Sequence, residues 1–261
     1  MRPLEELRAH CFRGLLFDID DTLTTHGKLT AQAYGAMERL HAAGKLVVPV
    51  TGRPAGWCDH IARMWPVDAV VGENGAFHFW YDSAAGKLRK HYQDSPAVRA
   101  QKRASLDAVA QRILRQVPGC ALASDQAYRE TDLAIDYCED VQALPLAAAE
   151  RIASLMRAEG LRAKISSIHV NGWFGEYDKF SATRRVLAQR WGVDPAQAGA
   201  QFVFAGDSPN DAPMFAFFAH SVGVANVKRF AGAIESEPKF VTQAACGEGF
   251  VELIGHLLSS A

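Results

Sequence analysis

The feature that most constrains the fold is an apolar run near the start of the chain that ends abruptly in carboxylates. Residues 15–17 are Leu-Leu-Phe, and Asp18, Asp20 and Asp21 occupy three of the next four positions. A short, continuous apolar run predicts a strand buried on both faces. Carboxylates beside a core cost free energy unless a cation or hydrogen bonds offset them, and packed like charges raise one another's pKa. The run therefore predicts a functional site, where a bound metal ion would relieve the charge.

Strand-like and helix-like segments alternate in the first part of the chain. We expect a strand at 15–20, a helix at 31–43 between Thr30 and Gly44, a strand at 46–50, a helix at 55–65 and a strand at 67–71. The alternation resumes with a helix near 179–191, a strand at 202–205, a helix from about 210, a strand at 221–224 and a helix near 248–258. This order predicts a parallel sheet with right-handed crossovers and helices on both faces.

The pattern differs between about residues 77 and 172. We expect strands near 77–81 and 87–93, a helix near 97–117, a strand at 132–138, a helix at 145–159 and strands within 162–173. Paired strands are typical of an inserted α+β domain rather than of a βα repeat. The predicted class is α/β, with a Rossmann-like, doubly wound parallel sheet core formed by residues 1–82 and 174–261, and an α+β insertion at 83–173.

Composition narrows the classes of partner. The net charge is −1, which gives no general attraction to nucleic acid or membrane. The five cysteines are widely spaced without a C-x-x-C pair, which favours reduced thiols over a zinc site, and no apolar stretch approaches the ~20 residues of a membrane span. The charged N-terminal residues do not resemble an export signal. We expect a cytoplasmic protein without nucleic-acid or membrane partners; its oligomeric state stays open.

Polar residues follow the predicted core strands at the edge where ligands bind in open α/β sheets. Asp18 and Asp20 follow the first strand, and Thr51-Gly52-Arg53 follow the second. Lys179 opens the helix after the insertion, and the strand at 202–205 is followed by Gly-Asp-Ser-Pro-Asn-Asp at 206–211. Phosphoryl transfer through an enzyme-bound phosphate needs a nucleophile, a hard cation, donors for phosphate oxygens and an acid/base group. Residues that fit these needs are Asp18, Asp20, Thr51, Lys179 and Asp207.

The four motifs, in this order, resemble those of the haloacid dehalogenase superfamily. The resemblance implies that Asp18 is the nucleophile and a Mg²⁺ ligand, and that Asp20 is the acid/base, with its carbonyl oxygen on the metal. It also implies that Thr51 and Lys179 hold the phosphoryl group. Asp207 would bind Mg²⁺ and Asp211 would support the metal site, although both could also serve as helix caps.

Asp21 departs from the commoner motif, in which many relatives have glycine. Aspartate tolerates unusual backbone angles better than most residues, so we expect the change to be benign. The sequence assigns Asp21 no role.

The position of the insertion narrows the resemblance to a subgroup. Thr51 follows Thr22 by 29 residues and Lys179 follows Thr51 by 128, so the insertion must lie between the second and third motifs. This placement, and the segment Gly72–Ala76, resemble the Cof-like (type IIB) subgroup, with its sucrose-phosphatase-like, trehalose-phosphatase-like and mannosyl-3-phosphoglycerate-phosphatase-like members. The resemblance implies a Mg²⁺-dependent phosphatase of a small phosphomonoester, a sugar phosphate above all, in which residues 83–173 form the cap domain.

Other residues are weaker candidates for contact with substrate. Ser167 and His169 alternate with apolar residues, so they share one strand face that could meet a sugar or simply be solvated. The remaining candidates are Thr22, Gly52, Arg53, Asn74 and Asn210. The basic run at 87–116 could steer anionic substrates, but an exposed helix face is the favoured interpretation.

Two alternative functions remain open from the sequence. A phosphosugar mutase would use the same core to return the phosphate to its substrate. A non-catalytic phosphosugar-binding protein would use the scaffold alone, although such a protein has no need of the second aspartate, Asp20.

Overall fold

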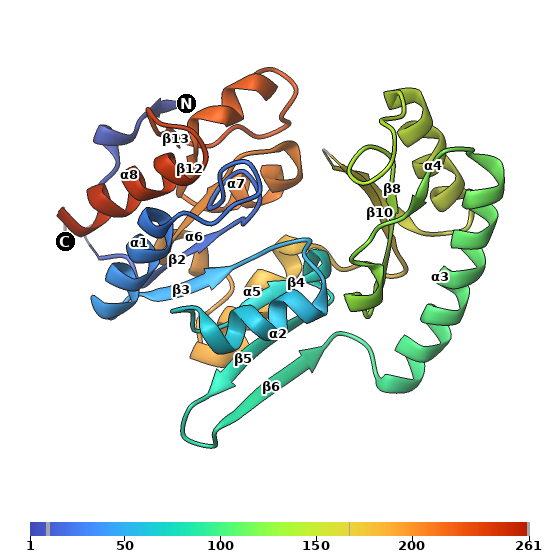
Figure 1. The fold of residues 1–261 in the computed structure, drawn as a ribbon. Coiled ribbons are helices and arrows are strands. Elements are labelled where there is room, and N and C mark those ends of the chain that lie inside the picture. Colours follow the sequence, from blue (N-terminus) through green and yellow to red (C-terminus); the bar gives the residue numbers. More distant parts are fainter. Residues whose placement is uncertain (9–10, 167, 260–261) are drawn as a thin grey trace. The chain divides into compact units, whose positions relative to one another are not determined.

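The computed structural model describes residues 1–8, 11–166 and 168–259. Contacts divide this part of the chain into two compact units (Figure 1). Unit 1 comprises residues 1–52, 58–91 and 178–261, and unit 2 comprises residues 53–57 and 92–177. Residues 83–91 group with unit 1, whereas the sequence placed the start of the insertion at residue 83. The division into a catalytic core and a cap domain stays a prediction.

Unit 1 is built on a six-stranded sheet whose order is β1-β13-β12-β11-β2-β3. Every neighbouring pair is parallel. The strands are β1 (Arg2–Pro3), β2 (Gly14–Phe17), β3 (Leu46–Pro49), β11 (Phe202–Gly206), β12 (His220–Gly223) and β13 (Phe240–Val241). The predicted α/β class is confirmed. The two-residue strands β1 and β13 were not predicted, because so short a segment carries no periodicity.

Helices cover the sheet on both faces, as the uninterrupted apolar strand predicts. On β2, Leu15 and Phe17 pack in one core cluster with α1 (Ala31–Ala42) and α8 (Cys246–Ser259). Leu16 points to the other face and packs in a second cluster with α5 (Lys179–Trp191) and α7 (Ala212–Phe217). Burial from both sides fixes the direction of β2, and with it the position of the residues that follow.

A second, three-stranded sheet in unit 1 has the order β4-β5-β6. Its strands are β4 (Val70–Gly72), β5 (Phe77–Asp82) and β6 (Lys87–Tyr92), and α2 (Ala55–Met64) precedes them. A single parallel bridge between Val50 and Val71 links it to the chain directly after β3. The predicted third strand is thus linked in parallel to the end of the second, but it begins later than residue 67 and belongs to a separate sheet.

Unit 2 is an α+β unit with an antiparallel sheet of order β7-β8-β10-β9. The strands are β7 (Ala121–Leu122), β8 (Asp132–Asp136), β9 (Arg162–Ile165) and β10 (His169–Trp173). The helices α3 (Pro96–Gln116) and α4 (Leu146–Ala158) pack in one cluster with Leu133, Ile135 and Val170 of the sheet. His169 and Asn171 alternate with Val170 and so lie on the opposite face.

Short helical segments complete the described chain. They are α6 (Ala198–Gln201) and the 3₁₀ helices η1 (Leu4–Glu6), η2 (Glu73–Gly75), η3 (Gln126–Tyr128), η4 (Pro209–Asp211) and η5 (Ala225–Phe230). Within the described ranges, no helix is both long enough and apolar enough to span a bilayer.

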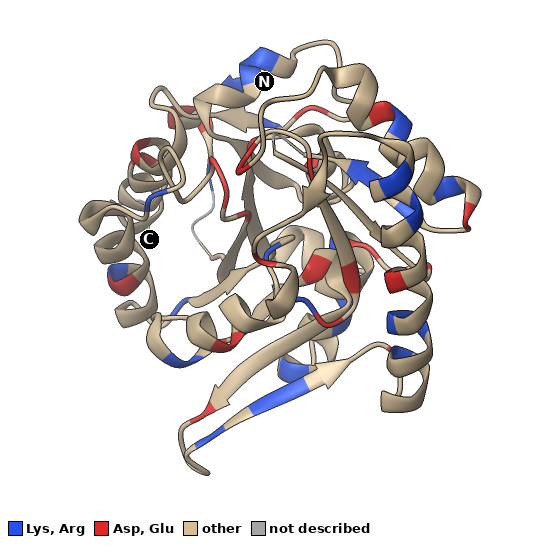
Figure 2. Cartoon of the chain, turned by 45° about the vertical axis from the view of Figure 1, so that its right-hand side comes forward, with Lys and Arg blue, Asp and Glu red and all other residues tan. Residues whose placement is uncertain are grey.

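Basic residues recur along α3 and on β6 (Figure 2). On α3, Lys102 lies 2.6 Å from Asp94, Arg103 lies 3.1 Å from Asp107, and Arg112 pairs with Glu159. These ion pairs within unit 2 are the pattern of a solvated helix face, the interpretation that the sequence favoured.

We expect Gly14→Ala to destabilise the protein. A Cβ at Gly14 would overlap the carbonyl oxygen of Leu46 on the neighbouring strand, which cannot move without breaking the β2–β3 pairing. Overpacking of this kind costs about 1–3 kcal/mol. Thermal or urea unfolding measures the loss.

The matched control is Gly255→Ala in α8, where an added Cβ has nothing within 4 Å. Alanine is the better helix former, so this variant is expected to be as stable as the wild type or slightly more stable. Equal unfolding midpoints for Gly14→Ala and the wild type would contradict the account of close strand packing.

Candidate active site

Asp18 directly follows β2, at the carboxyl edge of the parallel sheet. Its backbone N–H donates to the carbonyl oxygen of Ala205 on β11 at 3.0 Å, which continues the strand pairing by one residue. Its Oδ1 accepts a hydrogen bond from the N–H of Ile19 at 2.8 Å, and only 5% of the residue is exposed. The sheet thus presents one buried carboxylate in a fixed orientation.

Lys179 supplies the positive charge next to Asp18. Asp178 caps α5 through a capping box with Ser181, so Lys179 is the first residue of the helix. The Lys179 Nζ lies 2.7 Å from Asp18 Oδ2 and 3.1 Å from Asp211 Oδ1, and all three side chains are buried. Burial favours a lower pKa for this ammonium, but Asp18 and Asp211 outweigh burial and raise the pKa of Lys179. The lysine is therefore charged and bridges two carboxylates.

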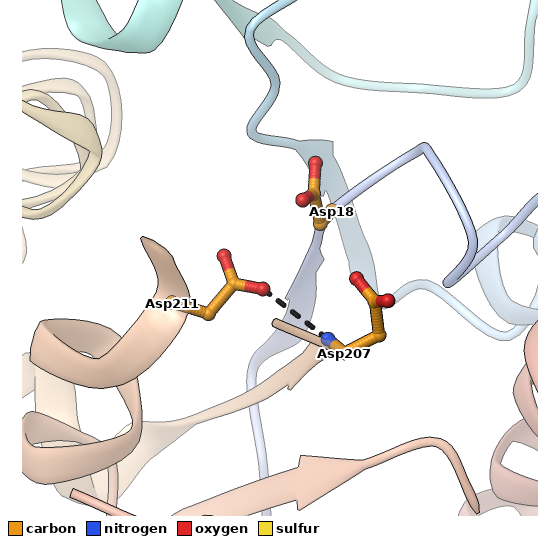
Figure 3. A group of neighbouring side chains, drawn as sticks. All are labelled: Asp18, Asp207 and Asp211. Carbon is orange, nitrogen blue, oxygen red and sulfur yellow. Dashed lines mark hydrogen bonds between the residues drawn. The ribbon is translucent and has the colours of Figure 1, made fainter. Parts of the chain in front are cut away.

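Asp207 and Asp211 come from the segment that follows β11. Asp211 Oδ2 accepts a hydrogen bond from the backbone N–H of Asp207 at 3.2 Å (Figure 3). Gly206 makes this approach possible, because a Cβ there would lie 2.5 Å from Asp211 Oδ2. The segment folds back so that both carboxyl groups lie next to Asp18.

The three carboxyl groups form one buried cluster. An oxygen from each of Asp18, Asp207 and Asp211 lies within 4.8 Å of the others. Burial raises the pKa of Asp207 to about 8, helped by the negative charges of Asp18 and Asp211. Burial also raises the pKa of Asp18 to about 7, because the effect of Lys179 does not offset burial and the neighbouring carboxylates Asp211 and Asp20. When all are ionised, three carboxylates and one ammonium leave two negative charges.

A divalent cation fits this donor set in charge and in chemistry. Carboxylate oxygens are the hard ligands that Mg²⁺ prefers, and two added positive charges would balance the cluster. Figure 3 shows the three carboxylates side by side, with the Asp211 carboxylate also accepting the hydrogen bond from the Asp207 N–H. The assignment of Asp18 and Asp207 as direct ligands, with Asp211 in support, stays a prediction.

Thr51 and Gly52, from the second predicted motif, follow β3 at the same edge of the sheet. The Thr51 N–H donates to Val71 O at 2.9 Å, and Thr51 O accepts from the Asn74 N–H at 3.1 Å. A Cβ on Gly52 would lie 3.3 Å from Asn74 Oδ1, so the Asn74 side chain packs against the Gly52 backbone. Asn74 itself has a φ of 57°, a conformation that asparagine adopts more readily than most residues.

The residues directly after Asp18 form a tight turn. Asp20 is half-buried, and its charge helps to raise the pKa of Asp18. Asp21 has a φ of 54°, which explains why aspartate, like glycine, is tolerated here. Thr22 is buried, and its Oγ1 donates to Asp207 Oδ1 at 3.4 Å. A direct substrate contact by Thr22 stays a prediction.

For the remaining predicted site residues, the structure shows contacts with neighbouring side chains. Arg53 belongs to unit 2 and stacks over the Trp57 ring at 4.2 Å. His169 Nε2, also in unit 2, lies 2.8 Å from Glu139 Oε2. Asn210 Oδ1 accepts from Ser208 Oγ at 2.7 Å. Ser167 lies outside the described residues. Substrate contacts by Arg53, His169 and Asn210 stay predictions.

Two residues beside Asp207 were missed at the sequence level. Asn226 Nδ2 donates to Asp207 Oδ2 at 3.0 Å, and Arg229 Nη2 donates to the same oxygen at 3.2 Å. Both lie in η5, which follows β12. The available signal was their place after the carboxyl end of a core strand, where ligand sites gather.

The raised pKa of Asp207 predicts an effect on stability in cation-free protein. Its ordinary value is 3.8 and its folded value is about 8, so the folded state binds the extra proton between these values. Stability therefore falls as pH rises through this window. Asp207→Asn removes the penalty, so its unfolding midpoint relative to wild type should rise by a few °C between about pH 5 and pH 9, measured with a chelator present.

The control for this experiment is Asp107→Asn. Asp107 is an exposed carboxylate on α3, paired with Arg103. Its midpoint relative to wild type should not change over the same pH range. A constant difference between Asp207→Asn and wild type would show that Asp207 is already ionised at pH 5.

Comparisons with known proteins agree with the fold and with the N-terminal motifs. The family model of haloacid dehalogenase-like hydrolases matches residues 15–111. The comparison with curated proteins gave no match.

Several solved structures are similar over nearly the whole chain. A Thermoplasma acidophilum protein is 18% identical, with a TM-score of 0.71, over 95% of this chain and 99% of that one. A sucrose-phosphatase from Synechocystis, solved with sucrose and phosphate, is 17% identical, with a TM-score of 0.64, over 94% and 98%. A haloacid dehalogenase superfamily phosphatase from Bacteroides thetaiotaomicron is 18% identical, with a TM-score of 0.61, over 97% of each chain. Residues 15–111 thus match the family model of haloacid dehalogenase-like hydrolases, and the chain as a whole shares the fold of these solved structures.

Proposed function

We propose that the protein is a Mg²⁺-dependent phosphatase that hydrolyses a small phosphomonoester through an aspartyl-phosphate on Asp18. One observation carries the proposal: Asp18 lies buried at a strand end, 2.7 Å from the Lys179 ammonium and within 4.8 Å of two further carboxylates. A structural ion pair has no use for the additional buried acids, since each adds a cost of burial. A site for phosphate and a divalent cation uses all of them.

In the first step, an Asp18 carboxylate oxygen attacks phosphorus. The bond between phosphorus and the ester oxygen breaks, and Asp20 donates a proton to that leaving oxygen. Lys179 and Thr51 donate to the non-bridging phosphoryl oxygens, whose negative charge they offset. The products of this step are the free alcohol and a phosphorylated Asp18.

In the second step, water attacks the phosphorus of the aspartyl-phosphate. Asp20, now ionised, accepts a proton from the water, and the bond between phosphorus and the Asp18 oxygen breaks. Inorganic phosphate is released and both carboxyl groups return to their initial states. Asp20 suits this exchange because it is half-buried beside Asp18.

Asp18 and Asp207 would hold the cation, together with the Asp20 carbonyl oxygen, and Asp211 would orient the site through the Asp207 N–H. When bound, the cation supplies electrostatic stabilisation of phosphoryl oxygens and favours the ionised form of Asp18. The net charge left by the carboxylates and Lys179 supports this assignment.

We propose a sugar phosphate as the substrate class. The support is similarity of fold to a sucrose-phosphatase solved with sucrose and phosphate and to a sugar phosphatase of haloacid dehalogenase subclass IIB. The predicted cap domain, which unit 2 largely contains, belongs to this proposal as the source of substrate selectivity. A phosphate-release screen over phosphorylated sugars and other small phosphomonoesters, with and without Mg²⁺, tests the class directly.

A phosphosugar mutase is the second candidate, because the same acids could return the phosphate to another hydroxyl group of the substrate. Release of inorganic phosphate without a bisphosphate activator excludes it as the main activity. Tight binding of a phosphosugar with no turnover in Mg²⁺ would instead favour the non-catalytic alternative.

Asp18→Asn is expected to abolish phosphate release, because an amide cannot form the aspartyl-phosphate. The measurement is inorganic phosphate released from the best substrate of the screen. Asp107→Asn is the control and should retain full activity. Undiminished turnover by Asp18→Asn would overturn the assignment of the nucleophile.

Asp20→Asn should separate the two steps. An aryl phosphate has a leaving group that departs without protonation, so the variant should still phosphorylate Asp18 but hydrolyse the intermediate slowly. Rapid mixing is expected to show a burst of about one phenolate per enzyme, followed by slow turnover. A linear time course at the wild-type rate would show that Asp20 is not the acid/base.

A further inference from the structure

The Arg229 side chain lies between two carboxylates at the edge of the cluster. Its Nη2 is 3.2 Å from Asp207 Oδ2 and 3.6 Å from Asp21 Oδ2. Half of the Arg229 side chain is exposed, whereas that of Asp207 is buried. Arg229 is therefore a half-exposed cation next to the buried carboxylate of Asp207, and the Asp21 carboxylate is close enough to be a second partner.

Backbone hydrogen bonds hold Asp21, the second carboxylate beside Arg229, in place. Its N–H donates to Thr24 Oγ1 at 3.2 Å, and its carbonyl oxygen accepts from Asn226 Nδ2 at 3.0 Å. These contacts hold a residue whose φ of 54° is unfavourable for most side chains. The turn thus keeps a half-exposed carboxylate close to Arg229.

Asn226 ties the two carboxylate-bearing segments together. Its Nδ2 donates both to the Asp21 carbonyl and to Asp207 Oδ2, and its Oδ1 accepts from the Cys246 N–H at 2.9 Å. Asn226 and Arg229 lie in the same 3₁₀ helix, η5, so one short segment contacts both the Asp21 turn and Asp207.

From this network we propose that Arg229 is an internal counterion of Asp207, which a divalent cation displaces onto Asp21. In cation-free protein Arg229 lies 3.2 Å from Asp207 and offsets its negative charge when that carboxyl group is ionised. A bound cation takes over that function, and Asp21 then retains the guanidinium, which would otherwise repel the cation. Asp21 and Arg229 are positioning residues in this proposal and touch no reacting atom.

The inference rests on the proposed cation site, so the test measures cation binding rather than turnover. Titration calorimetry with Mg²⁺ and Mn²⁺ gives Kd for the wild type and variants, and thermal unfolding in a chelator gives the stability of the cation-free protein. Arg229→Gln should tighten binding by about 3–10-fold, since a positive charge next to the cation is removed. At pH 9, where Asp207 is ionised, the same variant should unfold at a lower temperature than wild type without cation, because Asp207 loses its counterion.

Asp21→Asn should act in the opposite direction and weaken cation binding by a similar factor. Without the Asp21 carboxylate, the guanidinium of Arg229 stays next to Asp207, where it repels the cation. In the Arg229→Gln background, Asp21→Asn should have a smaller effect, since there is no guanidinium left to retain. Arg229→Lys keeps the charge and should lie closer to wild type than Arg229→Gln.

The matched control is Arg63→Gln, which removes a half-exposed arginine paired with Asp59 at 2.7 Å on α2. Its Kd should equal that of wild type. An unchanged Kd for Arg229→Gln in protein that binds the cation would overturn the counterion role alone. If Asp21→Asn changes Kd by the same factor in the wild-type and Arg229→Gln backgrounds, the proposed displacement of Arg229 onto Asp21 is wrong. If wild-type protein binds neither cation, both the cation site and this inference fail.

Discussion

The contact of the Lys179 ammonium with Asp18 and Asp211 is the interaction on which the rest of the site depends. Three carboxyl groups are buried within 4.8 Å of one another, and an unpaired buried charge costs about 3–5 kcal/mol. Lys179 is placed by the cap of α5, Asp18 by burial of β2 on both faces and Asp211 by the turn after β11. The elements of the parallel sheet therefore converge on one ammonium group.

The charge left over by that contact links stability to function. Asp18 and Asp207 have raised pKa values because burial and mutual repulsion oppose ionisation. The same excess of negative charge is what a divalent cation and a phosphoryl group together require. On the proposed function, the features that cost the cation-free protein stability are those that prepare it to bind. Arg229, at the exposed edge, moderates that cost without closing the site.

Much of this arrangement was predictable from sequence because two simple rules apply. The apolar run at 15–17 indicated a strand buried on both faces, and the carboxyl ends of parallel strands meet at one edge, which brings Asp18 and Asp207 together. Asn226 and Arg229 follow the carboxyl end of β12, so the second rule indicated their approximate place, but no feature of the sequence indicated that either one contacts Asp207. Their role depends on where the turn at Asp21 places its carbonyl oxygen, and no local pattern encodes that position.

The order of strands in the central sheet has a consequence for synthesis of the protein. β2 lies between β3 and β11, and β11 is encoded far downstream, after the whole of unit 2. A nascent chain on the ribosome therefore carries one unpaired edge of its central strand, with Asp18 at its end and Lys179 not yet made. Pairing of such distant segments is slow, and an unpaired strand edge favours aggregation. Synthesis must proceed as far as Asp211 before Asp18, at the end of β2, can acquire its buried partners.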